Sequence, residues 1–156
     1  MNAYPNGLYV DEEGDWYYQG NRIVRNDLIQ LFLANLQRSS SGEYAIELNH
    51  NRCSVSAADT PFVVSTVDRT KAENSSEEQI VLSLRHFERS ENLDPSSLWV
   101  GENDVLYCQI SKGRFPARFS RPAYYQLTEW LQEDSTNDEY FIYLNGKAYF
   151  IRRLRK

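Results

Sequence analysis

Two arginines, Arg118 and Arg121, lie at the start of a predicted helix and are the side chains best suited to chemistry in this sequence. Ser120 and Pro122 favour a helix start here, because a serine hydroxyl caps free N–H groups and proline loses no hydrogen bond in the first turn. A helix N-terminus carries unpaired N–H groups and a partial positive charge. Arginines leading into it predict a site for an anionic group such as phosphate or carboxylate.

The same arrangement occurs earlier in the chain. When the sequence is shifted by 96 positions, residues 22–55 align without a gap on residues 118–151, and Arg22 and Arg25 fall on Arg118 and Arg121. This self-similarity indicates an internal duplication of a helix followed by an antiparallel hairpin. If the copies pack about a pseudo-twofold axis, their helix starts face each other across one cleft. The other identical pairs are Gln30/Gln126, Leu31/Leu127, Ser39/Ser135, Glu43/Glu139, Tyr44/Tyr140, Ile46/Ile142, Leu48/Leu144 and Asn49/Asn145.

Two interpretations of the arginines stay open. In the first, Arg118 and Arg121 bind the charge of a ligand, Arg25 faces them, and aromatic side chains stack on a flat part of the ligand. In the second, the arginines form structural ion pairs with carboxylates such as Asp59 or the repeated glutamates, and the aromatic residues belong to the core. Aromatic residues near the arginines are Trp16, Tyr18, Phe115, Phe119, Tyr124 and Tyr125. The candidate ligand-binding residues are Arg118, Arg121, Arg25, Arg22, Tyr124, Trp16, Tyr18 and Asp59.

No catalytic or metal-binding motif accompanies these residues. His50 and His86 have no second histidine or carboxylate at ligand spacing. Cys53 and Cys108 form no CxxC pair, and in a reducing compartment they are expected to be small buried hydrophobic residues. Their spacing from the histidines does not suggest a Cys–His nucleophile, and no GxGxxG or GxxxxGK[ST] loop is present. We therefore expect no cofactor, no metal and no enzymatic activity.

The composition limits the class of protein. The 156 residues are 41% hydrophobic and 13% aromatic, enough for a core formed by one domain or two small halves. The net charge of −5 argues against a protein that coats nucleic acid or an anionic membrane. The first residues lack the basic stretch and apolar run of a signal peptide, and no apolar run is long enough to cross a bilayer. We expect a cytoplasmic protein.

Hydrophobic periodicity predicts an α+β protein with two related halves, residues 1–60 and 61–156. A period near 3.6 predicts helices over residues 22–38 and 120–131. Alternating and β-branched runs predict strands, and Asn145-Gly146 predicts a tight hairpin turn. The expected strands are residues 8–10, 15–19, 43–48, 52–57, 62–67, 80–84, 98–100, 105–110, 140–144 and 149–151. Residues 68–78, 88–97 and 133–138 are polar and are expected to connect these elements.

Several short motifs, taken in their order and spacing, cover most of the chain. They are Gly14-Asp15-Trp16-Tyr17-Tyr18-Gln19-Gly20, then Ile23, Arg25, Leu28, Phe32, Leu36 and Arg38, then Gly42-Glu43-Tyr44, Asp59-Thr60-Pro61-Phe62, Ala117-Arg118-Phe119-Ser120-Arg121-Pro122 and Tyr124-Tyr125. Together they resemble an uncharacterised bacterial family, domain of unknown function 1285. The resemblance implies a duplicated α+β core whose C-terminal half is loosely like a pleckstrin-homology barrel. It also implies a ligand site between the halves, for a nucleotide-like molecule, in signal transduction.

The leading functional hypothesis is a non-enzymatic ligand-binding or signalling module that binds a small anionic, nucleotide-like molecule at the interface of its two halves. An alternative is a protein–protein interaction adaptor that uses a strand edge or an aromatic cleft. A hydrolase is the third hypothesis, and it requires a nucleophile within hydrogen-bond reach of a base.

Overall fold

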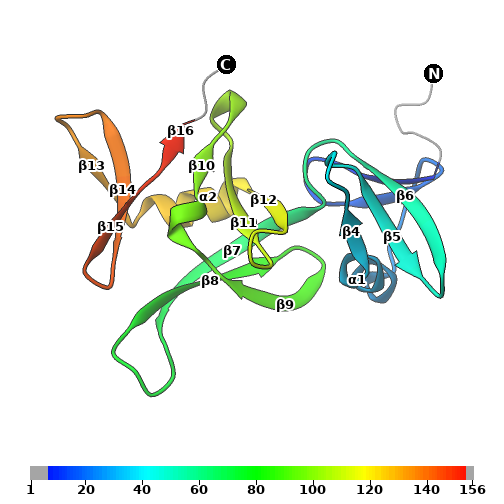
Figure 1. Ribbon diagram of the computed structural model, residues 1–156, viewed down its shortest axis with the longest axis horizontal. Helices are drawn as coiled ribbons and strands as arrows, with labels where there is room; N and C mark the ends of the chain where they lie inside the picture. The colour runs from blue at the N-terminus through cyan, green and yellow to red at the C-terminus, as the bar shows by residue number, and fades with distance from the viewer. Residues whose placement is uncertain (1–6, 154–156) are drawn as a thin grey trace.

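The computed structural model describes residues 7–153, which form two α-helices and three β-sheets (Figure 1). The predicted α+β class is confirmed, although most of the regular structure is β-strand. We call residues 8–57 the N-terminal unit, residues 62–92 the central strands and residues 98–153 the C-terminal unit. Within the described residues, neither helix has the length and apolar character that a membrane span requires.

The N-terminal unit packs a six-stranded sheet against a short helix. Its helix, α1 (Asn26–Ala34), buries Ile29 and Leu33, which lie one turn apart and so share a face. The strand order is β3-β2-β1-β6-β5-β4, in which β1 pairs in parallel with β6 and the other pairs are antiparallel. The strands are β1 (Leu8–Val10), β2 (Trp16–Tyr18), β3 (Asn21–Arg22), β4 (Leu36–Arg38), β5 (Tyr44–Leu48) and β6 (Asn51–Ala57).

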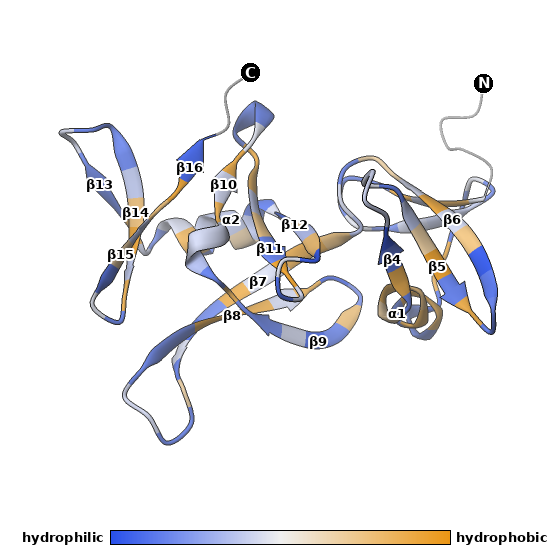
Figure 2. Ribbon diagram, viewed as in Figure 1, coloured by the Kyte–Doolittle hydropathy of each residue, from blue (hydrophilic) through white to orange (hydrophobic). Residues whose placement is uncertain are grey.

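The central strands form an antiparallel meander between the two units. They are β7 (Phe62–Lys71), β8 (Glu78–Leu84) and β9 (Phe87–Asn92). Because β7 pairs in parallel with β12 (Phe115–Phe119), they extend the sheet of the C-terminal unit, whose order is β16-β10-β11-β12-β7-β8-β9. The exposed β7–β8 turn and β9 are polar, as the blue colour of these segments in Figure 2 shows.

The C-terminal unit contains the second helix, α2 (Arg121–Thr128), and a separate three-stranded sheet. Two short 3-10 helices, η1 (Pro95–Ser97) and η2 (Glu102–Asp104), flank its first strand. The remaining strands are β10 (Trp99–Val100), β11 (Leu106–Ile110), β13 (Leu131–Asp134), β14 (Glu139–Leu144), β15 (Lys147–Phe150) and β16 (Arg152–Arg153).

Each helix is followed by three antiparallel strands with closely matching registers. In the N-terminal unit Ile46 pairs with Cys53, and in the C-terminal unit Ile142 pairs with Tyr149, at the 96-residue offset found in the sequence. The first strand of each set is displaced by one residue, since Leu36 pairs with Ile46 while Leu131 pairs with Ile142.

The correspondence extends to the strands before each helix, which the sequence comparison did not detect. Tyr17 pairs with Arg22 in β2–β3, and Tyr107 pairs with Arg118 in β11–β12. The parallel pair β1–β6 likewise has a counterpart in β10–β16. The connection between β11 and β12 is longer than that between β2 and β3, so the sequence offset changes and a gapless alignment stops at Arg22. The predicted division at residue 60 stays a prediction.

Both helices are shorter than predicted, and the strands β4 and β13 were missed. Leu36 and Leu131 continue the helical spacing, yet each begins a strand. The first helix ends at Asn35, whose side-chain amide donates a 2.8 Å hydrogen bond to the carbonyl oxygen of Leu31. The predicted polar connections were also too long, because residues 87–92 form the edge strand β9 and β7 extends to Lys71. Edge strands carry polar side chains on both faces, so apolar alternation does not mark them.

One hydrophobic cluster runs through both units and the central strands. It includes Trp16 and Leu33 from the N-terminal unit, Val67 and Leu82 from the central strands, and Ile142 from the C-terminal unit. The two units are therefore packed on a shared core. The N-terminal unit and β7 pack closely at Gly14, whose φ is +88° and where an added Cβ would lie 2.9 Å from Cγ2 of Val63.

We expect Gly14→Ala to lower the free energy of unfolding by about 2 kcal/mol, because it combines left-handed backbone strain with a clash. Gly20→Ala is the matched control: its φ is +81°, but nothing lies within 4 Å of the added Cβ. It should lose only about 1 kcal/mol, from backbone strain alone. Urea unfolding of the two variants separates the cost of backbone strain from the cost of the clash. Equal losses would contradict a close contact between Gly14 and Val63.

Candidate functional site

A cleft of about 790 Å³ lies between the β1–β2 turn of the N-terminal unit and the start of α2. Its lining contains three basic side chains, Arg85, Arg118 and Arg121, and three acidic side chains, Glu12, Glu13 and Asp104. We call it the inter-unit cleft. Its remaining lining residues are Val63, Ser65, Asn103, Val105, Leu106, Phe119, Ser120, Pro122, Tyr124 and Tyr125.

Arg118 reaches this cleft but is held by carboxylates. Its guanidinium lies 2.8 Å from Oδ2 of Asp59 and 3.9 Å from Glu12. The same Asp59 oxygen accepts a 2.6 Å hydrogen bond from the hydroxyl of Tyr107. Burial, with the hydrogen bond to Asp59 and the charge of that carboxylate, raises the pKa of Tyr107 to about 12. Arg118 and Asp59 therefore form a structural ion pair, the second of the two interpretations left open by the sequence.

Arg121 differs from Arg118, because within residues 7–153 it forms no ion pair with a carboxylate. The backbone donors beside it are mostly occupied. Ser120 Oγ accepts from the N–H of Ala123 at 3.3 Å, the Ser120 carbonyl accepts from the N–H of Tyr124, and Pro122 has no N–H. The expectation of an open helix N-terminus is thus corrected: in α2 the exposed guanidinium of Arg121 is the group left for an anion.

The two earlier arginines do not face the inter-unit cleft, which corrects the expected placement of Arg25 opposite Arg118. Arg25 forms an exposed 2.7 Å pair with Asp27 in the first turn of its own helix. Arg22 lies 3.5 Å from Asp15, away from the cleft lining.

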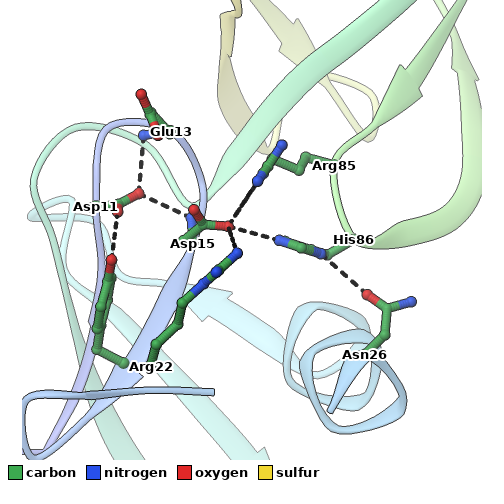
Figure 3. Close-up of polar contacts among 8 residues, drawn as sticks. Asp11, Glu13, Asp15, Arg22, Asn26, Arg85 and His86 are labelled. Carbon is green, nitrogen blue, oxygen red and sulfur yellow. Dashed lines mark hydrogen bonds and ion pairs between the residues drawn. The ribbon is translucent and has the colours of Figure 1, made fainter. Parts of the chain in front are cut away.

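Asp15 is the centre of a polar cluster that joins the N-terminal unit to the β8–β9 turn (Figure 3). Its carboxylate accepts hydrogen bonds from Arg85 at 3.0 Å and His86 at 2.9 Å, while only 8% of the residue is exposed. Burial by itself raises the pKa of Asp15, but the hydrogen bonds from His86 and Arg85 and the charges of Arg85 and Arg22 lower it overall. The other nitrogen of His86 contacts Oδ1 of Asn26 at 3.1 Å.

The aromatic candidates separate into three groups. Trp16 is fully buried against Phe32, with ring centroids 5.6 Å apart, so its proposed stacking role is corrected to a core role. Tyr18 is 50% exposed and lies at a different pocket, in the N-terminal unit. Tyr124 and Tyr125 line the inter-unit cleft with their ring centroids 5.6 Å apart, and Tyr125 is 59% exposed.

The described residues contain no serine, threonine or cysteine hydrogen-bonded to a histidine. Both ring nitrogens of His86 contact Asp15 and Asn26. Burial, with the nearby charges of Glu91 and Asp94, raises the pKa of the Cys108 thiol far above its ordinary value. No cluster of His, Cys, Asp and Glu in this part of the chain has the geometry to hold a metal ion.

Sequence reasoning missed Asp104 in the C-terminal unit and three charged cleft residues outside it, Glu12, Glu13 and Arg85. Arg85 and the two glutamates belong to none of the motifs found in the sequence. Their approach to α2 depends on the parallel pairing of β7 with β12, a long-range contact that no local pattern encodes.

We expect Asp15→Asn to lower the free energy of unfolding by about 2 kcal/mol at neutral pH, a figure reduced because Arg22 and Arg85 are partly exposed. The pKa of Asp15 is lower in the folded state than in the unfolded state. The carboxylate therefore stabilises the fold fully at a pH above its unfolded pKa, and this stabilisation is lost as the pH falls through its folded pKa. The difference between wild type and variant should therefore shrink as the pH falls below the unfolded pKa of about 4. Urea unfolding across this range measures it.

Asp27→Asn is the control for this pH series, because Asp27 also pairs with an arginine but is fully exposed. Its effect at neutral pH should be much smaller, and so should the change of that effect as the pH falls. An Asp15→Asn loss that does not depend on pH would contradict the assigned role of the carboxylate.

Comparison with known proteins supports this fold. Two DUF1285 family proteins of known structure are similar to the chain, one from Silicibacter pomeroyi and one from Shewanella baltica. The first has a TM-score of 0.74 and 17% identity over 94% of this chain and 79% of its own. The second has a TM-score of 0.63 and 20% identity over 78% of this chain and 90% of its own. No family model and no curated protein matches the sequence. The resemblance drawn from the sequence is thus confirmed at the level of the fold: this chain folds as these DUF1285 family proteins do.

Proposed function

We propose that the chain is a non-enzymatic ligand-binding module that takes a small anionic, nucleotide-like molecule in the inter-unit cleft. The observation that carries this proposal is the free guanidinium of Arg121 at the edge of a cleft of about 790 Å³. A cleft of this volume lies within the range of small-molecule sites, roughly 300–1,000 Å³.

The mixed charge of the cleft favours a particular class of anion. Arg121 suits a phosphate or carboxylate group, while Glu12 and Glu13 on the facing turn accept hydrogen bonds from hydroxyl or amino groups. Tyr125 offers an exposed ring for stacking. A nucleotide carries all three features, an anionic group, sugar hydroxyls and a flat base. Inorganic phosphate carries only the first, and the glutamates disfavour it.

We further propose that the two units arose by duplication. The matching registers of the strands around α1 and α2 support this origin. The pleckstrin-homology likeness of the C-terminal half stays a prediction. A signalling role in the bacterial cytoplasm belongs to the same proposal, and two unpaired cysteines suit a reducing compartment.

We expect a thermal-shift screen of nucleotides and phosphorylated metabolites to raise the melting temperature of the intact protein by about 5 °C or more with one compound class, at concentrations near a hundred times its Kd. Arg121→Ala should weaken that compound about tenfold or more, because it removes a charge-assisted hydrogen bond. Arg118→Ala is unsuitable as the principal test, since it also breaks the pair with Asp59.

Arg114→Ala is the matched control, because Arg114 is exposed, lies outside the cleft and carries the same charge. It should bind the compound as wild type does. If no compound shifts the melting temperature, or if both arginine variants bind equally well, the cleft proposal is wrong.

The alternative of a protein-interaction adaptor is favoured by a different observation, an apolar pocket in the N-terminal unit.

A further inference from the structure

The N-terminal unit contains a second concave site, distinct from the inter-unit cleft. It has a volume of about 520 Å³, and every residue lining it is uncharged. It lies between α1 and the β5–β6 hairpin, and we call it the N-terminal groove. Its lining residues are Leu8, Tyr18, Ile23, Leu28, Phe32, Ile46, Leu48, Asn49, Asn51 and Cys53.

The corresponding region of the C-terminal unit is filled by the chain itself. There the β7–β8 hairpin runs from α2 to the β14–β15 turn (Figure 1). Arg69 of β7 donates a 2.8 Å hydrogen bond to the carbonyl oxygen of Tyr143. Leu144 is 6% exposed under this cover, whereas its counterpart Leu48 is only half-buried. The two units therefore have corresponding grooves, and among residues 7–153 a chain segment covers only the groove of the C-terminal unit.

Repeated amide side chains hold the central strands. Gln126 on α2 accepts from the backbone N–H of Val67 at 3.0 Å, and its counterpart Gln30 on α1 accepts from the N–H of Glu88 at 2.9 Å. Asn145, in the β14–β15 turn, binds both backbone groups of Glu78: its oxygen accepts from the N–H and its amide donates to the carbonyl, each at 2.8 Å. Each of these side chains thus recognises an extended backbone.

Asn49 is the fourth member of this set and has no backbone partner. It occupies the same turn position as Asn145, with φ of 50° against 51°, and it lines the N-terminal groove. Its exposed side chain makes no hydrogen bond within residues 7–153. A primary amide presents one donor and one acceptor side by side, which match the N–H and C=O of an extended peptide residue.

We propose that the N-terminal groove binds an extended segment of a partner protein, with apolar side chains at alternate positions in the groove and one residue's backbone paired with Asn49. Alternate side chains of a strand point to the same face, so a single strand delivers two or three of them into the groove. The uncharged lining requires these to be uncharged. The partner segment would bind as β8 does in the C-terminal unit. There the backbone of Glu78 pairs with Asn145, and the alternate side chains of Ile80 and Leu82 are fully buried.

The test selects displayed random 12-residue peptides against the intact protein and measures the affinity of the enriched peptides. Cys53→Asp places a charge in the groove, and Ser54→Asp places the same charge on the opposite face of β6, so the two form a matched pair of exposed positions. We expect peptides with alternating apolar residues that bind Ser54→Asp as tightly as wild type. Asn49→Ala should bind about tenfold more weakly through the loss of its two hydrogen bonds, and Cys53→Asp should not bind measurably.

Alkylation of Cys53 gives an independent readout in the wild-type protein. Cys53 is exposed in the groove and Cys108 is buried, so iodoacetamide should modify only Cys53 in the folded state. A saturating peptide should slow this reaction at least about tenfold by covering the thiol. Arg121→Ala should leave peptide binding unchanged, so failure of the inter-unit cleft proposal does not affect this one.

Three outcomes would overturn the inference. The first is that no peptide is enriched, or that enriched peptides bind Cys53→Asp as well as wild type. The second is protection of Cys53 by palmitate without any peptide that protects it, which would identify a site for an apolar small molecule. The third is concentration-dependent self-association that Cys53→Asp abolishes, which would identify a second copy of the chain as the occupant.

Discussion

The arrangement of the two units depends on carboxylates that accept from several chain segments at once, above all Asp15. This residue belongs to the β1–β2 turn, yet its partners Arg85 and His86 come from the β8–β9 turn of the central strands. A nearly buried carboxylate is stable only when such partners surround it, so their geometry fixes one unit against the other. Asp59 acts in the same way on Arg118 and Tyr107. The shape of the inter-unit cleft follows from these two contacts.

The grooves of the two units differ in whether another segment covers them. The central strands pair with β12 and cover the groove of the C-terminal unit, whereas no equivalent segment among residues 7–153 covers the groove of the N-terminal unit. The burial of Leu144 and the partial exposure of Leu48 follow from this difference, because both leucines precede an asparagine at the end of the corresponding strand. Leu48 and Leu144, at matching positions of the two hairpins, therefore differ in burial because only Leu144 lies under the β7–β8 hairpin.

The sequence predicted the features that depend on neighbouring residues. The alternation around Ile142 and the Asn145-Gly146 turn both appear where expected, and the repeated hairpins share the predicted offset. Prediction from the sequence failed where contacts between distant residues determine the secondary structure or the burial. Leu36 fits the helical period equally well, but pairing with Ile46 places it in a strand. The sequence cannot distinguish a buried tryptophan from an exposed one at position 16, because Trp16 is buried by the packing of α1 on the sheet.

The arginines show why the candidate site could not be read from residue type alone. All four are repeated in sequence, but Arg22, Arg25 and Arg118 each have a carboxylate within ion-pair distance. A guanidinium whose charge is already balanced by a carboxylate attracts a second anion less strongly, because the carboxylate repels that anion. Arg121 faces no such competition from the carboxylates of residues 7–153. Any electrostatic preference of the cleft for an anion therefore depends on this one side chain, and Glu12 and Glu13 oppose it unless the ligand also carries hydrogen-bond donors.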